Sequence, residues 1–201
     1  MSASLPIVYL ARHGETAWSL SGQHTGLSDI PLTERGERMA VALGERLRGM
    51  NFATVLSSPL NRAYRTCELA GFAAQARVDP DLVEWNYGQY EGLTSKQIHA
   101  ERPDWNLFRD GCPGGEMPSA IAARADALVA RLRKLPDPIL LFSSGHITRV
   151  IAARWLGLAV EIMAARLLLG TASLSALSYE HTLGEPAIRL WNDTRHLNNV
   201  N

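Results

Sequence analysis

Short apolar segments and longer segments with helical spacing alternate along most of the chain. Short, largely apolar segments bounded by turn residues predict strands, and continuous apolar ones predict strands buried on both faces of a sheet. The predicted strands are residues 7–11, 54–56, 139–142, 167–169, 174–179 and 188–191, with a short extended stretch at 78–83.

Apolar residues three and four positions apart predict amphipathic helices between these strands. One begins after Thr33, a suitable N-cap, and ends near Gly49. A second has Pro59 in its first turn, a third covers residues 121–132, and a fourth ends at Gly157. Residues 18–31 are expected to form a polar loop. Residues 82–114 are rich in Trp, Tyr, Gly and Pro, and we expect them to hold only short helices, at 95–101 and 105–109.

This order of elements predicts an α/β fold. Strands that alternate with helices form a largely parallel sheet with helices packed on both faces, which is a three-layer α/β/α sandwich. A chain of 201 residues suits one large domain, or one domain with a small insertion.

Composition limits the partners. Lysine and arginine together number 20, as do aspartate and glutamate, so the formal net charge is zero. No field of the whole molecule draws it to nucleic acid or to an anionic membrane, and we expect neither as a partner. A binding site for anions must therefore have local positive charge. The oligomeric state stays open, a homo-oligomer included.

Two cysteines, Cys67 and Cys112, are too few for a disulfide framework in a chain of this length. Cys67 is expected to be a small core residue, whereas Cys112 lies in a loop rich in Gly and Pro. No run is long enough to span a membrane, and the first residues lack the pattern of a signal peptide. We expect a cytoplasmic protein.

Reactive side chains follow several of the predicted strands. Arg12 and His13 end the first strand, and Arg62 lies in the helix after the second. Glu84 follows the extended stretch, and His146 follows the strand at 139–142. Because ligand sites of open α/β sheets lie beyond the carboxyl ends of the strands, we expect these five side chains to converge.

The set suits phosphoryl transfer, in which catalysis depends on positioning and on stabilising charge. Arg12 and Arg62 offer planar donors to a phosphate, and His146 would be a third cation once a dianion is bound. Nearby cations should lower the pKa of His13 and keep it neutral for attack on phosphorus. Glu84 could protonate the leaving group and then deprotonate a water. We expect no metal ion and no cofactor.

Each residue also has a structural interpretation. A histidine that ends a strand is more often hydrogen-bonded than nucleophilic, and Arg62 could belong to a solvated helix face. Glu84 could be a surface residue and His146 a helix cap. The placement of Arg12 and His13 together, directly after a buried strand, favours the functional interpretation.

The motifs resemble those of the histidine phosphatase superfamily, also called phosphoglycerate mutase-like, over nearly the whole chain. They occur in the family's order: Leu10-Ala11-Arg12-His13-Gly14-Glu15-Thr16, Thr25-Gly26-Leu27, Pro31-Leu32-Thr33, Ser57-Ser58-Pro59-Leu60-Asn61-Arg62-Ala63, Leu82-Val83-Glu84, Tyr87-Gly88, Glu91-Gly92 and Gly145-His146. Ser19 stands where many members have Asn, and Gly145 precedes His146 where many have Gly after it.

The resemblance implies that residues 1–201 form one histidine phosphatase domain, in which an irregular and helical insertion at about 85–118 covers the active site. His13 would be the phosphorylated nucleophile, Arg12, Arg62 and His146 the phosphate pocket, and Glu84 the proton donor. The implied substrate-binding residues are Ser19, Thr25, Gly26, Tyr87 and the backbone N–H of Ile147.

Further residues are similar to the sedoheptulose-1,7-bisphosphatase-like, broad-specificity phosphatase branch. They are Trp18-Ser19, Ser21-Gly22-Gln23, Trp105-Asn106, Arg109-Asp110-Gly111-Cys112, Gly115-Glu116, and Gly145-His146 with Arg149. The resemblance implies a phosphomonoester hydrolase (EC 3.1.3.-) acting on a small phosphorylated metabolite such as a sugar phosphate or bisphosphate. Arg109 and Lys96 are candidates for the far end of such a substrate. A mutase of the phosphoglycerate type and an inactive binding relative are the alternatives.

Overall fold

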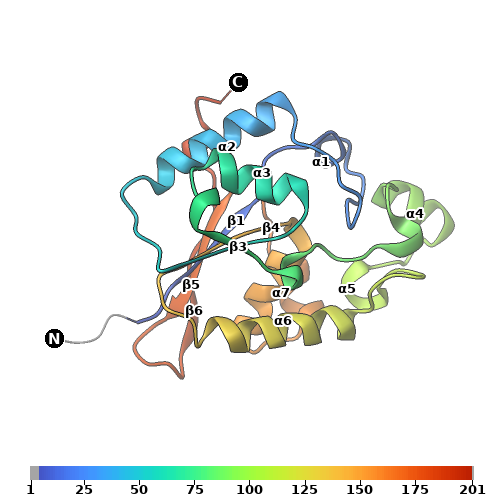
Figure 1. Cartoon of the computed structure of the whole chain (residues 1–201). Helices are drawn as coiled ribbons and strands as arrows, with labels where there is room; N and C mark the ends of the chain where they lie inside the picture. Colours follow the sequence, from blue (N-terminus) through green and yellow to red (C-terminus); the bar gives the residue numbers. More distant parts are fainter. Residues whose placement is uncertain (1–4, 201) are drawn as a thin grey trace.

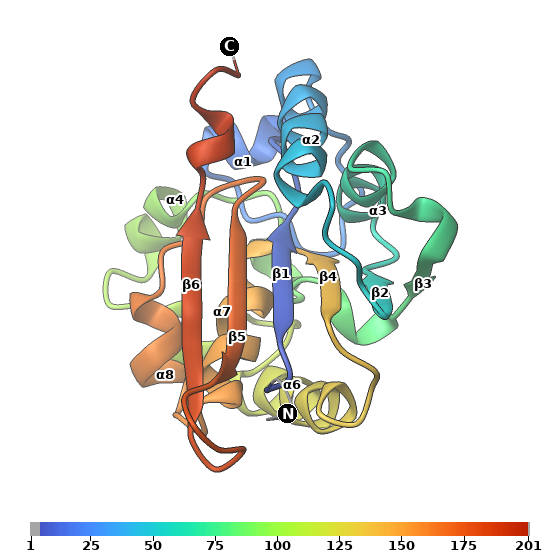
Figure 2. The same cartoon turned by 90° about the vertical axis from the view of Figure 1, so that its left-hand side faces the viewer.

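The computed structural model describes residues 5–200, and a six-stranded sheet runs through this part of the chain. The strands lie in the order β3-β2-β4-β1-β5-β6 (Figure 2). Their bounds are β1 Val8–Arg12, β2 Thr54–Ser57, β3 Ala76–Val78, β4 Ile139–Ser143, β5 Leu174–Tyr179 and β6 Pro186–Asp193. The pairs among β3, β2, β4 and β1 are parallel, while β5 is antiparallel to β1 and to β6. The predicted mostly parallel sheet is confirmed.

Helices cover both faces of the sheet, which gives three layers (Figure 1). α2 (Glu34–Leu47) and α3 (Asn61–Leu69) lie on one face, and α6 (Pro118–Leu132) and α7 (Gly145–Trp155) lie on the other. The predicted α/β/α sandwich is therefore confirmed.

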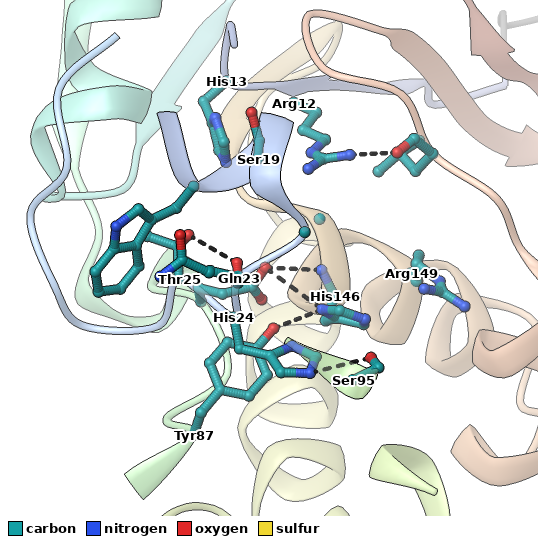
Figure 3. A pocket seen from close by; sticks show the side chains of 15 residues that line it. Arg12, His13, Ser19, Gln23, His24, Thr25, Tyr87, Ser95, His146 and Arg149 are labelled. Carbon is teal, nitrogen blue, oxygen red and sulfur yellow. Dashed lines mark hydrogen bonds and ion pairs between the residues drawn. The ribbon is translucent and has the colours of Figure 1, made fainter. Parts of the chain in front are cut away.

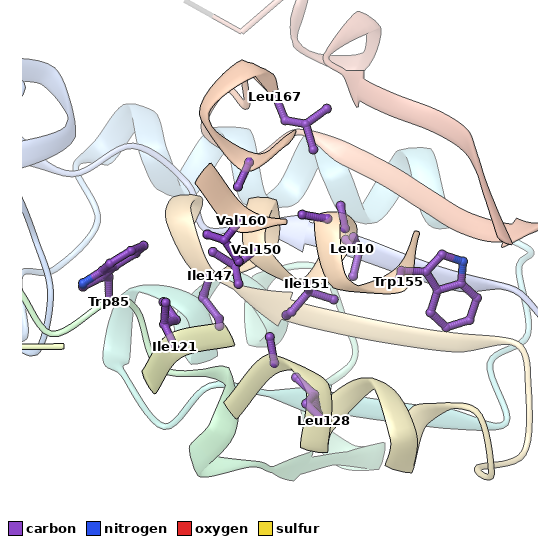
Figure 4. Close-up of a cluster of buried hydrophobic side chains, with 14 of the residues drawn as sticks. Leu10, Trp85, Ile121, Leu128, Ile147, Val150, Ile151, Trp155, Val160 and Leu167 are labelled. Atoms are coloured by element: carbon purple, nitrogen blue, oxygen red, sulfur yellow. The ribbon is translucent and has the colours of Figure 1, made fainter. Parts of the chain in front are cut away.

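Alternate residues of the central strands point into two apolar clusters. Leu10 and its neighbour Leu141 belong to the cluster packed against α6 and α7 (Figure 4). Ala11 and its neighbour Phe142 belong to the cluster packed against α2 and α3. Because both faces are covered, these strands have continuous apolar sequences instead of an alternation of apolar and polar residues.

Shorter helices connect the main elements. The α-helical ones are α1 (Ala17–Ser21), α4 (Ser95–Glu101), α5 (Leu107–Asp110) and α8 (Val160–Met163). The 3-10 helices are η1 (Ala73–Gln75), η2 (Pro80–Leu82), η3 (Gly88–Tyr90), η4 (Ala164–Arg166) and η5 (Arg195–Leu197). The segment at about 85–118 thus contains η3, α4 and α5 before α6 begins. Within residues 5–200, no helix has the length and apolar character needed to cross a membrane.

One predicted strand and the predicted extended stretch are wrong. The stretch at 78–83 is a strand only up to Val78, because Asp79 caps η2 and Pro80, which has no N–H for a strand ladder, begins it. Residues 167–169 have no regular structure; they form a loop whose Leu169 carbonyl accepts a hydrogen bond from Arg12.

The polar loop predicted at 18–31 also needs correction, because α1 occupies its first residues. Thr16 and Ser19 form a reciprocal capping box at its N-terminus. No residue of α1 is buried, so the helix has no apolar periodicity that would have predicted it.

Candidate active site

A cavity of about 290 Å³ opens at the carboxyl ends of β1 and β4. Arg12 and Ser143, the last residues of these strands, are register partners, so the two strands end side by side. The lining residues are Arg12, His13, Trp18, Ser19, Gly22, Gln23, His24, Thr25, Glu84, Tyr87, Ser95, Gly145, His146, Arg149 and Leu169 (Figure 3). Arg12, His13, Glu84 and His146 thus come together as predicted, whereas Arg62 does not line the cavity.

His13 is buried, with 3% of its surface exposed, and its ring orientation is fixed. Nδ1 lies 2.7 Å from the carbonyl oxygen of Gly14. Because a carbonyl only accepts, Nδ1 must carry the hydrogen, and Nε2 keeps its lone pair. The next residues are held closely, since a Cβ on Gly14 would lie 2.4 Å from the carbonyl oxygen of Gly36, and the Gly14 N–H donates to Thr66 Oγ1.

Burial and the charges of Arg12 and Arg62 hold the pKa of His13 well below its ordinary value. The ring is therefore neutral at neutral pH, as a nucleophile requires. This is the electrostatic effect that the sequence predicted for these residues.

Backbone carbonyls hold the two arginines in place. Arg12 Nη1 donates to the carbonyl of Leu169. The fully buried Arg62 donates to the carbonyls of Ser28, Thr25 and Gly26 at 2.9, 3.1 and 2.8 Å. The turn at 25–28 thus fixes the Arg62 guanidinium behind the cavity wall.

Three buried polar atoms near His13 have no hydrogen-bond partner within the part of the chain that the structure describes. They are Arg12 Nε, Arg62 Nε and Ser144 Oγ, and Ser173 Oγ and His196 Nδ1 are unpartnered as well. Of these five residues, Arg12 lines the cavity. Ser144 is the N-cap of α7, directly after β4, but its side chain makes no capping hydrogen bond. The sequence interpretation did not select Ser144, because a serine before a helix is an ordinary cap.

Glu84 is held by backbone N–H groups. Its Oε1 accepts from Trp85 N and Ile147 N, each at 2.8 Å, and its Oε2 accepts from His146 N at 2.9 Å. The carboxylate thus lies against the N-terminus of α7, whose dipole favours a negative charge there. Oε2 accepts a single hydrogen bond, which leaves it a second lone pair on the cavity side.

His146 is linked to Tyr87 through a hydrogen bond of 2.5 Å between Nδ1 and the phenol oxygen. Burial raises the pKa of Tyr87 well above its ordinary value, so the phenol keeps its proton. Burial, followed by the charges of Arg149, His24 and Arg12, holds the pKa of His146 well below its ordinary value. Without an anion the ring is therefore neutral, and it becomes a cation only if a bound dianion raises that pKa.

The predicted substrate-binding residues divide into two groups. Ser19, Thr25 and Tyr87 line the cavity. Gly26 is buried behind it, where its carbonyl binds Arg62, and the Ile147 N–H is already bound to Glu84.

Lys96 and Arg109 do not line the cavity. Lys96 is exposed, and Arg109 pairs with Asp110 and with the carbonyl of Asp104. Besides Arg12, the arginine that lines the cavity is Arg149, which the sequence analysis names only within the resemblance. Its position three residues after His146 on a helix places both on the same helix face, and this spacing could have selected it.

Among residues 5–200, no group of three or more His, Cys, Asp or Glu side chains is arranged to hold a metal ion. The expectation that no cofactor is needed stays a prediction.

We expect Arg62→Met to raise the pKa of His13, because it removes one of the two cations that oppose protonation of the ring. In the unaltered protein, the ring should stay neutral as the pH falls through 6.5 and become protonated only at lower pH. NMR titration of the imidazole measures both values. The control is Arg65→Met in the same helix, which removes an exposed arginine paired with Glu37 and Glu68 and should leave this pKa unchanged. An ordinary pKa for His13 in the unaltered protein would contradict this account.

Comparison with known proteins agrees with this geometry. The model of the histidine phosphatase superfamily (branch 1) matches residues 8–194. The chain is 38% identical over 183 residues to an acid phosphatase of Mycobacterium tuberculosis, with 89% of each chain covered. It is 37% identical over 194 residues to sedoheptulose 1,7-bisphosphatase of Saccharomyces cerevisiae, with 80% of this chain and 71% of the yeast protein covered. It is 34% identical over 185 residues to a probable phosphoglycerate mutase of Salmonella choleraesuis, with 87% and 86% covered.

A solved structure is also similar. The structure of the open reading frame Rv3214 of Mycobacterium tuberculosis matches with a TM-score of 0.86 and 36% sequence identity, over 93% of this chain and 97% of that chain. The family match spans both ends of the sheet and every residue of the cavity. The chain therefore belongs to branch 1 of the histidine phosphatase superfamily.

Proposed function

We propose that this chain hydrolyses a small phosphorylated metabolite, a sugar phosphate or bisphosphate, through a phosphohistidine formed on His13. The observation that carries the proposal is the state of His13, a buried neutral imidazole with Nδ1 bonded to Gly14 and Nε2 unprotonated. The phosphatase names of two relatives, 38% and 37% identical to this chain, support hydrolysis. A cavity of about 290 Å³ suits a small molecule.

In the first step, the lone pair of His13 Nε2 forms a bond to phosphorus while the bond from phosphorus to the leaving oxygen breaks. Glu84 enters this step protonated on Oε2, a state that the bound phosphate dianion favours because it opposes a further negative charge beside it, and gives its proton to the departing alkoxide. The Nδ1–H of His13 keeps its bond to the Gly14 carbonyl, which stabilises the positive charge that the phosphorylated ring carries.

In the second step, water attacks the phosphoryl group and the bond to Nε2 breaks, so His13 returns as a neutral imidazole. Glu84, now a carboxylate, takes a proton from the attacking water. Groups of the protein supply each proton and charge in this scheme, and we propose that it uses no metal ion or cofactor.

An unpartnered buried atom supports an anion site beside His13. Buried polar groups nearly always have hydrogen-bond partners, so Arg12 Nε, which belongs to a residue that lines the cavity, calls for an acceptor. Phosphate oxygens are acceptors that arginines bind strongly. Charge that develops on these oxygens in the transition state would be stabilised by donors already in place.

Arg149 supports a second anionic group on the substrate. Its Nε donates to the Ala164 carbonyl at 2.7 Å, and its guanidinium lies 4.7 Å above the ring of Phe108. Burial lowers its pKa and the charge of Glu84 raises it, but in the described part of the chain no carboxylate forms an ion pair with it. Arg149 acts on the pKa of His146, whereas the cations that act on His13 are Arg12 and Arg62. Arg149 would therefore bind a group some distance from the scissile phosphate, the role that the sequence had given to Arg109 and Lys96.

Phosphoglycerate mutase activity is a second candidate, favoured by the relative named as a probable phosphoglycerate mutase. A mutase returns the phosphoryl group to its product instead of to water. The two activities therefore share the first step and differ in the acceptor of the second.

We expect inorganic phosphate to be released when the protein is tested with sugar mono- and bisphosphates, phosphoglycerates, phosphoserine and nucleotides. His13→Ala should lower this release by about a thousandfold or more, because it removes the nucleophile. The control His181→Ala changes an exposed histidine outside the cavity and should keep full activity. Formation of the isomeric phosphoglycerate without phosphate release would instead show a mutase. Absence of turnover on every substrate, p-nitrophenyl phosphate included, would show an inactive relative.

We expect Arg149→Met to lower kcat/KM for a sugar bisphosphate by about tenfold to a hundredfold, since a hydrogen bond to a charged group contributes roughly 1.5–3 kcal/mol. The value for p-nitrophenyl phosphate should change little. Arg154→Met is the matched control, because Arg154 lies in the same helix but pairs with Asp126 and does not line the cavity. Equal losses on both substrates would contradict a second anion site.

A further inference from the structure

Arg124, in the second turn of α6, connects that helix to the backbone on the N-terminal side of Glu84. Its Nη1 donates to the carbonyls of Asp81 and Val83, each at 2.8 Å, and its Nη2 reaches the Glu84 carbonyl at 3.4 Å. Arg124 does not line the cavity, so it has no part in the steps described above.

Glu116 completes the connection on the C-terminal side of Glu84. It forms a two-bond pair with Arg124, Nε to Oε1 at 3.0 Å and Nη2 to Oε2 at 2.8 Å. Oε2 of Glu116 also accepts a hydrogen bond from the backbone N–H of Asn86. The backbone N–H of Glu116 donates to the Asn86 carbonyl, and the backbone carbonyl of Glu116 accepts from the indole N–H of Trp85. One ion pair therefore holds the chain directly before and directly after Glu84.

The pair is well placed to be strong. The Arg124 and Glu116 side chains are only 15% and 20% exposed, so water screens them less than it screens a surface pair. The planar guanidinium holds the carboxylate and the backbone carbonyls at the same time, a geometry that a lysine cannot reproduce. The segment from Val83 to Tyr87 has no helix or strand of its own, so no regular hydrogen-bond ladder fixes it.

We propose that Arg124, paired with Glu116, is a positioning residue that fixes Glu84 for proton transfer to the leaving group. The carboxylate of Glu84 is bound by α7, and the backbone of Glu84 is bound by Arg124 from α6. Because its carboxylate and its backbone are both held, the Glu84 side chain keeps one orientation toward the cavity. The inference rests on the proposed function, since it assigns Arg124 a role in the proton transfer by Glu84.

This role predicts a dependence on the leaving group. An alkoxide leaving from a sugar phosphate needs a proton in the transition state, whereas p-nitrophenolate is a stable anion and leaves without one. A change that displaces Glu84 alone should therefore slow alkyl phosphates and spare p-nitrophenyl phosphate. A general disturbance of the fold or of the phosphate pocket would slow both.

The test measures kcat/KM for a sugar phosphate and for p-nitrophenyl phosphate, because kcat/KM reports on the first phosphoryl transfer. The quantity compared between variants is the ratio of these two kcat/KM values. We expect Arg124→Met to lower the value for the sugar phosphate by about tenfold to a hundredfold, part of the 10²–10⁴ that acid–base catalysis contributes, and the value for p-nitrophenyl phosphate by about twofold or less. Arg124→Lys and Glu116→Gln, which preserve more of the fold, should change the ratio in the same direction by a smaller factor.

Arg131→Met is the matched control. Arg131 lies in the same helix and also contacts the chain before Glu84, but among the described residues its guanidinium binds the side chains of Asp79 and Asp81 and no backbone group, and its side chain is 46% exposed. Its loss should leave the ratio of the two kcat/KM values unchanged.

Glu84→Gln separates failure of the inference from failure of the proposed function. If Glu84→Gln changes the ratio and the Arg124 and Glu116 variants do not, the positioning role is wrong while the function stands. If Glu84→Gln itself leaves the ratio unchanged, Glu84 is not the acid and the proposed proton transfer is wrong. Equal losses on both substrates in Arg124→Met, Arg124→Lys and Glu116→Gln would show that Arg124 and Glu116 act on the fold alone.

Discussion

The site depends on a His13 imidazole that its burial and the two arginines beside it keep neutral. Burial and the charges of Arg12 and Arg62 lower the pKa of the ring, so a neutral imidazole lies beside two cations. Burial also lowers the pKa of both guanidinium groups, but an arginine does not lose its charge in a protein. The arrangement is favourable chiefly when an anion is present, which matches a protein that binds phosphate groups.

Such an arrangement needs rigid support, and the fold supplies it from several directions. The paired ends of β1 and β4 place His13 beside the N-terminus of α7. The carbonyls of the turn at 25–28 hold Arg62, and Glu91 binds the N–H groups of Gly26 and Ser28 in that turn. The segment that contains Glu84 and Glu91 therefore carries Glu84 at one end. At its other end, Glu91 supports the turn that holds Arg62. This explains why a segment whose regular structure is limited to the short η3 is nevertheless densely hydrogen-bonded.

The sequence was informative wherever burial left a pattern. The apolar strands and the helices that cover them were predictable, because a sheet covered on both faces requires continuous apolar segments. The polar residues that follow those strands were predictable as site residues for the same reason, since the strands end at one edge. The direction in which each arginine side chain points was not predictable. Arg62 binds backbone carbonyls, Arg109 pairs with its neighbour Asp110, and Arg149 lines the cavity, although all three are arginines in or near helices. The α1 helix was missed because none of its residues is buried.

The most direct test of the central claim is to mix the enzyme with a labelled phosphate ester, stop the reaction within milliseconds in alkaline denaturant, and locate the label by mass spectrometry. We expect a phosphoryl group on a ring nitrogen of His13, stable in base and lost in acid. A label on any other residue, or turnover with no phosphorylated protein at any time point, would contradict it.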